Sequence, residues 1–205
     1  MDGVAVEPGS VADADAVADL WVELARGQRD HGSTLTAAPN RTAARDDAAR
    51  HAVTGGLFVA RAAEADRSAD TEADAAGDAD AEGGGDTDRD DDADVGADDV
   101  DVEGAPVVVG FVTCGPESEG YDQDVDCGVV ENLYVRPAYR GSGVGAELLS
   151  RAEESLAADG ADVVTLEAMA DNGGARRFYE RHGYGEHRVE YRKPVGTESA
   201  ENDTD

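Results

Sequence analysis

Hydrophobic residues in the first third of the chain recur with two different spacings, one typical of strands and one typical of helices. Residues 4–6 form a short apolar stretch before a proline, which predicts a strand. Ser10 is a plausible N-cap, and apolar residues recur at roughly helical spacing from there to Gly27. A weaker helical pattern covers about residues 42–53, and a strand is expected over residues 57–62, after two glycines. The apolar residues of the first helix are Val11, Val17, Leu20, Trp21 and Leu24.

The second half of the chain predicts further strands and two more helices. Apolar residues between 144 and 158 fall on one helical face, and Gly160 follows them as a stop signal. The resulting order is β-α-α-β-β-β-α-β-α-β, which is an α+β arrangement rather than a strict alternation of strand and helix. The expected strands cover 106–114, 128–135, 163–168 and 189–192, and the expected helices cover 144–158 and 173–181.

Residues 64–103 differ in composition from the rest of the chain. They contain 18 Asp and Glu against two Arg, no aromatic residue and almost no large aliphatic one. Such a segment cannot bury enough apolar surface to offset the entropy lost on ordering, which predicts a disordered insertion. Recruitment of a basic partner is the alternative role for it. We therefore expect one domain over residues 1–195, interrupted by this insertion, and a polar tail over residues 196–205. If the insertion is a loop, the strands at 57–62 and 107–114 form one hairpin.

The overall charge limits the classes of partner. The 205 residues carry a formal net charge of −30, and Lys193 is the single lysine among 17 basic residues. This excess of acid argues against a nucleic-acid or membrane-surface partner, because phosphate groups require a basic face. It is typical of salt-loving organisms, in which negative charge keeps proteins soluble. The N-terminus lacks the basic and apolar regions of a leader, and no stretch approaches ~18 apolar residues, so we expect a cytoplasmic protein.

Two cysteines, Cys114 and Cys127, flank the expected hairpin loop. They are too few for a disulfide framework and lack the C-x-x-C spacing of a zinc site, so no metal site is predicted. Their position allows a disulfide, but two reduced, partly buried thiols are the favoured interpretation.

The stretch from Val129 to Gly145 carries the most informative chemistry. An apolar strand there leads through a short turn into a glycine-rich helix start. The free N–H groups and the dipole of a helix N-terminus attract anions, and glycine lets a ligand approach the backbone. We therefore expect a phosphorylated ligand at this turn.

Two common phosphate-binding motifs fit this turn poorly. A P-loop requires a lysine directly after the glycines, and none is present. The spacing Gly141-x-Gly143-x-x-Ala146 satisfies a dinucleotide fingerprint, with Glu167 at the end of the next strand as the ribose ligand. However, five residues separate the strand from Gly141, and only 65 residues remain from there on, too few for the repeated βα units of a dinucleotide fold.

The arrangement Arg140-x-x-Gly143-x-Gly145 after a strand closely resembles motif A of the GCN5-related N-acetyltransferase (GNAT) superfamily, whose usual form is Q/R-x-x-G-x-G/A. Downstream, the run from Asn172 to Tyr184 (N-G-G-A-R-R-F-Y-E-R-H-G-Y) is similar to motif B of the same family. The resemblance covers about residues 105–193 and implies the GNAT fold, a mixed and mostly antiparallel sheet flanked by helices. The composition adds the expectation of a haloarchaeon-like acidic member.

The resemblance implies acetyl-CoA as the cosubstrate and direct attack of an amine on its thioester. In this family the pyrophosphate lies on the backbone amides of the glycine-rich turn. The pantetheine pairs with the preceding strand, where a backbone N–H polarises the acetyl carbonyl. Tyr179 would then donate a proton to the departing thiolate. The implied cofactor-binding residues are Leu133, Tyr134, Val135, Arg140, Gly141, Ser142, Gly143, Val144, Gly145 and Asn172.

Glu131 is the candidate catalytic base, because it lies two residues from Leu133 on the same strand and hence on the same face. An exposed acid without a catalytic role is the alternative in so acidic a chain. The region of Glu23, Arg26 and His31 is expected to line the acceptor side, by analogy of fold alone. The two motifs do not identify which amine is the acceptor. A monomer or homodimer is expected, and a non-catalytic acyl-CoA-binding module of the same fold is the alternative to an enzyme.

Overall fold

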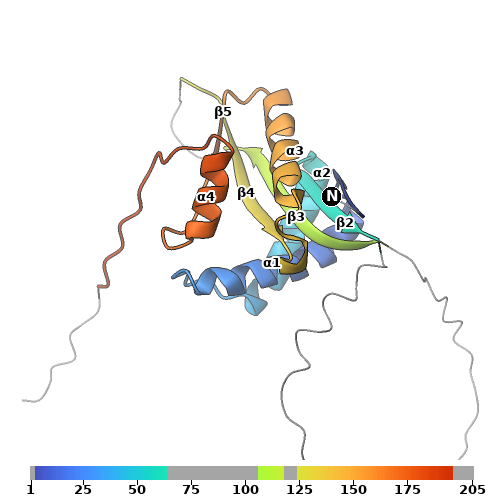
Figure 1. The fold of residues 1–205 in the computed structure, drawn as a ribbon, viewed down its shortest axis with the longest axis horizontal. Helices are drawn as coiled ribbons and strands as arrows, with labels where there is room; N and C mark the ends of the chain where they lie inside the picture. The colour runs from blue at the N-terminus through green and yellow to red at the C-terminus, as the bar shows by residue number, and fades with distance from the viewer. Residues whose placement is uncertain (1–2, 64–105, 118–123, 196–205) are drawn as a thin grey trace, which may run out of the picture.

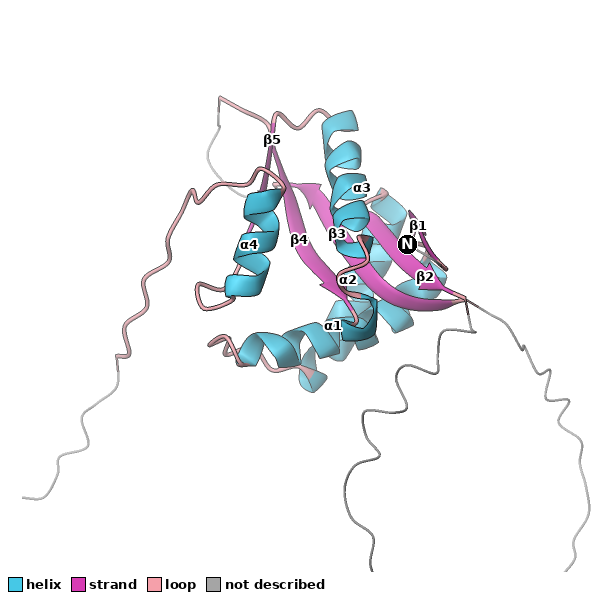
Figure 2. Ribbon diagram, viewed as in Figure 1, coloured by secondary structure: helices cyan, strands magenta, loops and turns pink. Residues whose placement is uncertain are grey.

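The computed structural model of the chain describes residues 3–63, 106–117 and 124–195. Within these ranges five strands form one sheet in the order β1-β2-β3-β4-β5, antiparallel except that β5 runs parallel to β4 (Figure 1, Figure 2). This is the mixed, mostly antiparallel sheet flanked by helices that the sequence predicts. The elements are β1 (Val4–Pro8), α1 (Ala14–Arg29), α2 (Arg41–Thr54), β2 (Leu57–Ala62), β3 (Val107–Pro116), β4 (Cys127–Val135), α3 (Val144–Ala158), β5 (Val163–Leu166) and α4 (Gly173–Arg181).

The hairpin expected on either side of the acidic segment is confirmed. β2 pairs antiparallel with β3, and Leu57 lies opposite Thr113. The disordered insertion expected at residues 64–103 and the tail expected at residues 196–205 lie outside the described residues, so both stay predictions.

The strand expected at residues 189–192 is wrong. Residues 185–195 contain neither helix nor strand, and Val189 and Tyr191 are 68% and 91% exposed. The segment leads away from the sheet in Figure 1. A short alternating stretch forms a strand only where a neighbouring strand offers hydrogen bonds and a packing surface. In the described part of the chain β5 is an edge strand, and this segment does not pair with it.

The sheet separates two hydrophobic clusters. Neighbouring residues of β2 point to opposite faces, so that Val59 packs with α1 and α2 whereas Ala60 packs with α3. Figure 1 shows α3 over one face of the sheet and α1 and α2 on the other. The apolar residues that predict the α3 face are all buried; they are Val144, Leu148, Leu149, Ala152 and Leu156.

A buried carboxylate fixes the start of α1. The helix start expected at Ser10 is a 3₁₀ turn over Val11–Asp13, and Val11 is 52% exposed rather than part of the helical face. The Ser10 N–H and hydroxyl both donate to Asp13, at 2.8 and 2.9 Å, and Arg61 of β2 donates to its other oxygen at 2.7 Å. Burial alone would raise the pKa of Asp13, but these hydrogen bonds outweigh it and lower the pKa.

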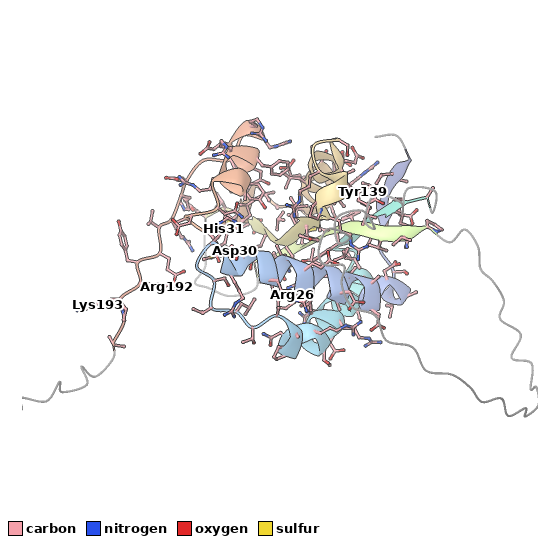
Figure 3. The ribbon with its side chains drawn as sticks, turned by 60° about the horizontal axis from the view of Figure 1, so that its bottom comes forward. Arg26, Asp30, His31, Tyr139, Arg192 and Lys193 are labelled. Atoms are coloured by element: carbon pink, nitrogen blue, oxygen red, sulfur yellow. The ribbon has the colours of Figure 1, made fainter. Side chains whose placement is uncertain are left out.

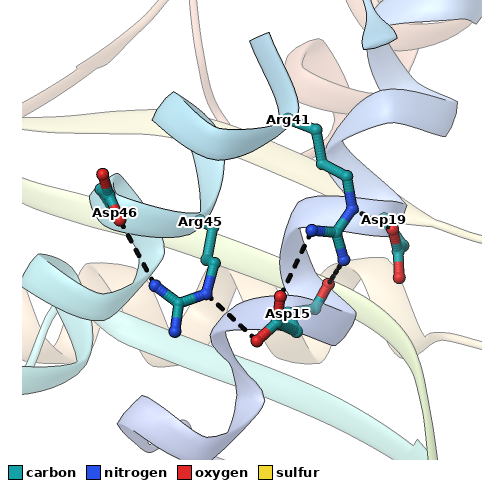
Figure 4. Close-up of polar contacts among 5 residues, drawn as sticks. All are labelled: Asp15, Asp19, Arg41, Arg45 and Asp46. Atoms are coloured by element: carbon teal, nitrogen blue, oxygen red, sulfur yellow. Dashed lines mark hydrogen bonds and ion pairs between the residues drawn. The ribbon is translucent and has the colours of Figure 1, made fainter. Parts of the chain in front are cut away.

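Arginines of α2 pair with acids of α1 at the surface (Figure 4). Arg41 lies 2.6 Å from Asp19 and 3.3 Å from Asp15, and Arg45 lies 3.1 Å from the second oxygen of Asp15. Because these side chains are 39 to 60% exposed, each pair adds little free energy. The two helices are therefore held mainly by buried apolar contacts with each other and with the sheet.

Both cysteines are reduced, as the sequence favours, and no disulfide joins them. Cys114 is buried, and burial with the nearby charges of Asp159 and Glu131 raises the pKa of its thiol to about 11. None of the helices among the described residues has the length and apolar character needed to cross a membrane.

Asp13→Asn is expected to lower the free energy of unfolding by about 1–3 kcal/mol at neutral pH, because Arg61 loses its buried charged partner. The pKa of Asp13 is lower in the folded state, so its carboxylate stabilises the fold above the unfolded pKa of about 3.9. This contribution is lost as the pH falls through the folded pKa. Urea unfolding should therefore show the two proteins converging below about pH 4.

Asp19→Asn serves as the matched control, because Asp19 is an exposed acid of α1 and its loss should change stability by less than about 0.5 kcal/mol. A stability difference between wild type and Asp13→Asn that stayed constant on acidification would contradict the assignment.

Candidate active site

The strands β4 and β5 pair at their start and then diverge. Their parallel pairing ends with Val130 opposite Leu166. β4 continues to Val135 along β3, while the chain leaves β5 toward α4. From Glu131 onward, the edge of β4 that faces β5 has no strand partner among the described residues. Its backbone groups are therefore available to a ligand that adds as a strand.

A cavity of about 80 Å³ lies at this divergence. It has room for a few water-sized groups, so it suits the reacting part of a substrate rather than a whole cofactor. Four elements or connections contribute its lining. They are α1 with Leu24 and Gln28, β4 with residues 130–133, the stretch after β5 with residues 167–169 and Asn172, and α4 with Ala175 and Tyr179.

A β-bulge in β4 sets the direction of Glu131. Val130 and Asn132 lie opposite successive residues of β3, so Glu131 is an extra residue between them. Its carboxylate reaches His51 of α2 on one face of the sheet, whereas Leu133 packs in the α3 cluster on the other. The expectation that Glu131 and Leu133 share a face is wrong, because the bulge breaks the two-residue period. Both residues nevertheless line the cavity.

Tyr179 lies on α4 and forms part of the cavity wall. Its ring packs edge-on against Phe178 and Tyr184, with centroids 5.3 and 5.9 Å away. Burial raises the pKa of the Tyr179 hydroxyl, so the group keeps its proton at neutral pH. The Tyr184 hydroxyl donates to Glu153 at 2.8 Å, whereas among the described residues no acceptor is recorded for Tyr179. Tyr179 can therefore donate its proton into the cavity.

The glycine-rich turn has the backbone of an anion-binding site. Gly141 and Gly143 have φ angles of +78° and +92°, a region that side chains with a Cβ disfavour. Gly143 is the N-cap of α3, and no side chain in the described ranges accepts a capping hydrogen bond there. The first N–H groups of α3 therefore lack intrahelical partners and can bind a phosphate.

Gly145 differs from the two glycines before it. A Cβ at this position would lie 3.7 Å from the ring of Phe178 and 3.8 Å from Val135. A side chain at this position would therefore point toward α4 and β4. Both distances are ordinary van der Waals contacts, so a methyl group fits there.

The side chains next to the turn mostly stabilise it. Arg140 Nε donates to the Val135 carbonyl at 2.8 Å, and its guanidinium lies 5.5 Å from the ring centroid of Tyr134. A phosphate contact by Arg140 must therefore use its remaining N–H groups. The Ser142 hydroxyl donates to a carbonyl within the turn at 2.8 Å. The Tyr134 hydroxyl donates to Glu23 of α1 at 3.1 Å, so Tyr134 offers the cavity side its backbone alone.

Asn172 is the N-cap of α4. Its Oδ1 accepts the Ala175 N–H at 3.0 Å, which fixes the side chain at the edge of the cavity. The remaining Nδ2 amide is the part of Asn172 that can hold a ligand.

The residues of α1 that line the cavity are not the ones expected on the acceptor side. Glu23 pairs with the arginine that follows β4, and neither Arg26 nor His31 lines the cavity. Figure 3 shows Arg26 and His31 toward the C-terminal end of α1. Leu24 and Gln28 of α1 line the cavity instead. The sequence did not predict them, because helical spacing alone does not indicate which turn of α1 lies against the cavity between β4 and β5.

Glu167 is a second carboxylate of the cavity that sequence reasoning did not assign to this site. It follows β5 directly and lies five residues before Asn172. This position at the end of a strand was the signal that could have placed Glu167 in the site. Together with Glu131 it makes the lining acidic.

The sequence profile of the acetyltransferase (GNAT) family matches residues 72–184, more than half of the chain. The chain therefore belongs to the acetyltransferase (GNAT) family. It is 33% identical over 89 residues to the uncharacterized N-acetyltransferase MJ1207 of Methanocaldococcus jannaschii, a match that covers 43% of this chain and 38% of that protein. The matched part spans 38 to 44% of the length of the curated relatives.

Solved structures of the same fold cover nearly the whole chain. A GCN5-related N-acetyltransferase from Ralstonia eutropha JMP134 is 20% identical with a TM-score of 0.58, covering 95% of this chain and 100% of that one. The aminoglycoside N-acetyltransferase AAC(6')-Iy, solved in complex with CoA, is 12% identical with a TM-score of 0.55, covering 94% and 95%. These structures confirm the expected GNAT fold.

Gly143→Ala is expected to destabilise the protein by about 1–2 kcal/mol, because its φ of +92° is strained for a residue with a Cβ. Gly145→Ala is the matched control, two residues further on, where the added methyl group meets ordinary contacts and φ is not positive. Thermal unfolding of both variants measures the difference. Equal losses of stability would contradict the conformational explanation of Gly143.

Proposed function

We propose that this chain is an N-acetyltransferase that transfers the acetyl group of acetyl-CoA directly to a primary amine. The observation that carries the proposal is the divergence of β4 from β5. One unpaired strand edge leads from a cavity lined by Glu131 and Tyr179 to the glycine-rich turn at the start of α3. The edge from Glu131 to Val135 extends roughly 13 Å, which suits an extended cofactor arm.

In this proposal the two ends of the cofactor use different groups. The pyrophosphate lies on the backbone amides of residues 140–145, which the positive φ angles of Gly141 and Gly143 leave accessible. The pantetheine adds to the β4 edge at residues 133–135 by backbone hydrogen bonds. The Nδ2 amide of Asn172 holds it from the α4 side, supported by the fixed position of this cap.

The reaction requires an aligned thioester, a stabilised oxyanion and two proton transfers. The amine nitrogen attacks the carbonyl carbon, a C–N bond forms, and the C–S bond breaks. A backbone N–H near Leu133 or Tyr134 stabilises the oxyanion. The Tyr179 hydroxyl, which burial keeps protonated, gives its proton to the leaving thiolate. The Glu131 carboxylate takes the proton from the attacking amine, a role supported by its place in the cavity lining.

The acidic lining favours cationic acceptors. Glu131 and Glu167 both line the cavity. Their carboxylates attract an acceptor that enters as an ammonium ion, which then loses a proton to become the attacking amine. We therefore propose a small amine, an amino-acid derivative or a protein N-terminus as the acceptor class.

The composition supports further parts of the proposal. A net charge of −30 with one lysine suits a haloarchaeon-like, halophilic and cytoplasmic enzyme with no nucleic-acid partner. We propose a single domain over residues 1–195 with residues 64–103 as a disordered insertion, acting as a monomer or homodimer.

Thiol release from acetyl-CoA, measured at molar salt against a panel of amines, tests the proposal. We expect release that depends on the amine, together with binding of CoA in calorimetry. CoA binding without thiol release for any amine would indicate a non-catalytic acyl-CoA-binding module. Absence of heat with both CoA and NAD would contradict every ligand proposed for the turn.

Tyr179→Phe and Glu131→Gln should each lower kcat by about 10²–10⁴, the usual contribution of a positioned acid or base. CoA affinity should change little, because neither side chain holds the phosphates. Tyr184→Phe is the matched control, since this neighbouring, partly buried hydroxyl already donates a hydrogen bond to Glu153. Equal loss of kcat in Tyr179→Phe and Tyr184→Phe would rule out a specific acid role for Tyr179.

A further inference from the structure

A histidine and two carboxylates from α2 and β4 meet beside the cavity. Asp47 and His51 lie one helical turn apart on α2, and Glu131 comes from the bulge of β4. One ligand atom from each residue lies within 4.8 Å of the other two. We propose that Asp47, His51 and Glu131 bind a divalent transition-metal ion of the zinc class.

The buried imidazole is oriented as a metal ligand requires. His51 is 6% exposed, and its Nδ1 lies 3.0 Å from the backbone carbonyl of Cys114. A carbonyl only accepts hydrogen bonds, so Nδ1 carries the proton. In neutral imidazole the lone pair is then on Nε2, which faces both carboxylates. Most metal-binding histidines are held in this way through their second ring nitrogen.

Two of the three separations between the ligand atoms are close to those of a tetrahedral ion, and the third is at most 4.8 Å. His51 Nε2 lies 3.1 Å from Glu131 Oε2 and 3.7 Å from Asp47 Oδ2. A tetrahedral zinc ion with ligand bonds of about 2.0–2.1 Å places its ligand atoms roughly 3.3–3.4 Å apart. A hydrogen bond between His51 and Glu131 also fits the shorter distance, and the experiment below separates the two.

The surroundings of the two carboxylates leave room for an ion. The first oxygen of Asp47 accepts a hydrogen bond from Arg50, which leaves Oδ2 for the metal. The Glu131 side chain is 41% exposed and lines the cavity, so a fourth ligand such as water can enter from that side. Imidazole with carboxylate oxygens is a donor set that zinc accepts.

Metal binding would engage the group that serves as the base in the proposed function. A bound ion draws the Glu131 carboxylate toward His51 and away from the amine, so the metal should inhibit acetyl transfer. This consequence rests on the proposed function, whereas metal binding itself does not.

The test uses the full-length chain, stripped with a chelator and dialysed against Zn²⁺ in molar KCl to suppress nonspecific binding to acids. We expect about one Zn²⁺ per chain, a higher Tm with Zn²⁺, and visible d–d absorption bands of tetrahedral type when Co²⁺ replaces it. Absence of stoichiometric Zn²⁺ would overturn the proposal and would show that His51 and Glu131 share a hydrogen bond only.

Variants locate the ion. Asp47→Asn and His51→Gln should weaken Zn²⁺ binding by more than the ~10–100-fold that loss of an outer-shell partner costs. Asp46→Asn is the matched control, because it removes the same charge from the neighbouring position of α2, where Asp46 pairs with Arg45. Equal Zn²⁺ affinity in Asp47→Asn and Asp46→Asn would overturn the site. Asp47 is partly exposed, so Asp47→Asn keeps the test valid if His51→Gln fails to fold.

The activity arm separates the two proposals. Zn²⁺ should inhibit thiol release by the wild type, reversibly by chelator, and should inhibit Asp47→Asn far less. Stoichiometric Zn²⁺ binding by a chain that shows no transferase activity even after a chelator has removed the metal would refute only the proposed function. Uninhibited activity in a chain that binds no Zn²⁺ would refute only the metal site.

Discussion

The divergence of β4 from β5 is the constraint on which the site depends. The two strands pair as far as Val130 and Leu166, and beyond that point β4 is held by β3 alone. Backbone groups that a continuous sheet would have satisfied are left for a ligand, because a strand edge remains a template for further pairing. Residues 130–133 of the cavity lining, the rest of the β4 edge and the start of α3 follow one another along the chain, so a single stretch of backbone connects the cavity to the glycine-rich turn.

The β-bulge at Glu131 couples this site to the other face of the sheet. One additional residue turns the carboxylate toward α2, where it meets the buried His51. The same side chain still lines the cavity, so it belongs to two environments. A regular strand would have directed Glu131 either to the cavity or to α2 alone, because its side chains alternate strictly between faces.

Most elements could be predicted from the sequence because their signals are local. The apolar spacing of α3, the glycines that follow helices and the turn glycines each reflect a backbone or burial requirement of a few neighbouring residues. The predictions failed where the structure of a segment depends on contacts with residues that are distant in the sequence. Residues 189–192 have a strand-like pattern without a neighbouring strand, and Val11 lies before the helix to which its spacing assigned it.

Local patterns in the sequence predicted the order of strands and helices as far as α4, the glycine-rich turn and the pair of motifs from which the GNAT family was expected. Which side chains meet depends on the folded arrangement. Leu24 and Gln28 reach the cavity, Glu131 and Leu133 separate to opposite faces, and Asp47, His51 and Glu131 converge. The reason is physical: local periodicity depends on neighbouring residues, whereas contacts between residues 80 positions apart depend on strand register and on a bulge that leaves no periodic signal.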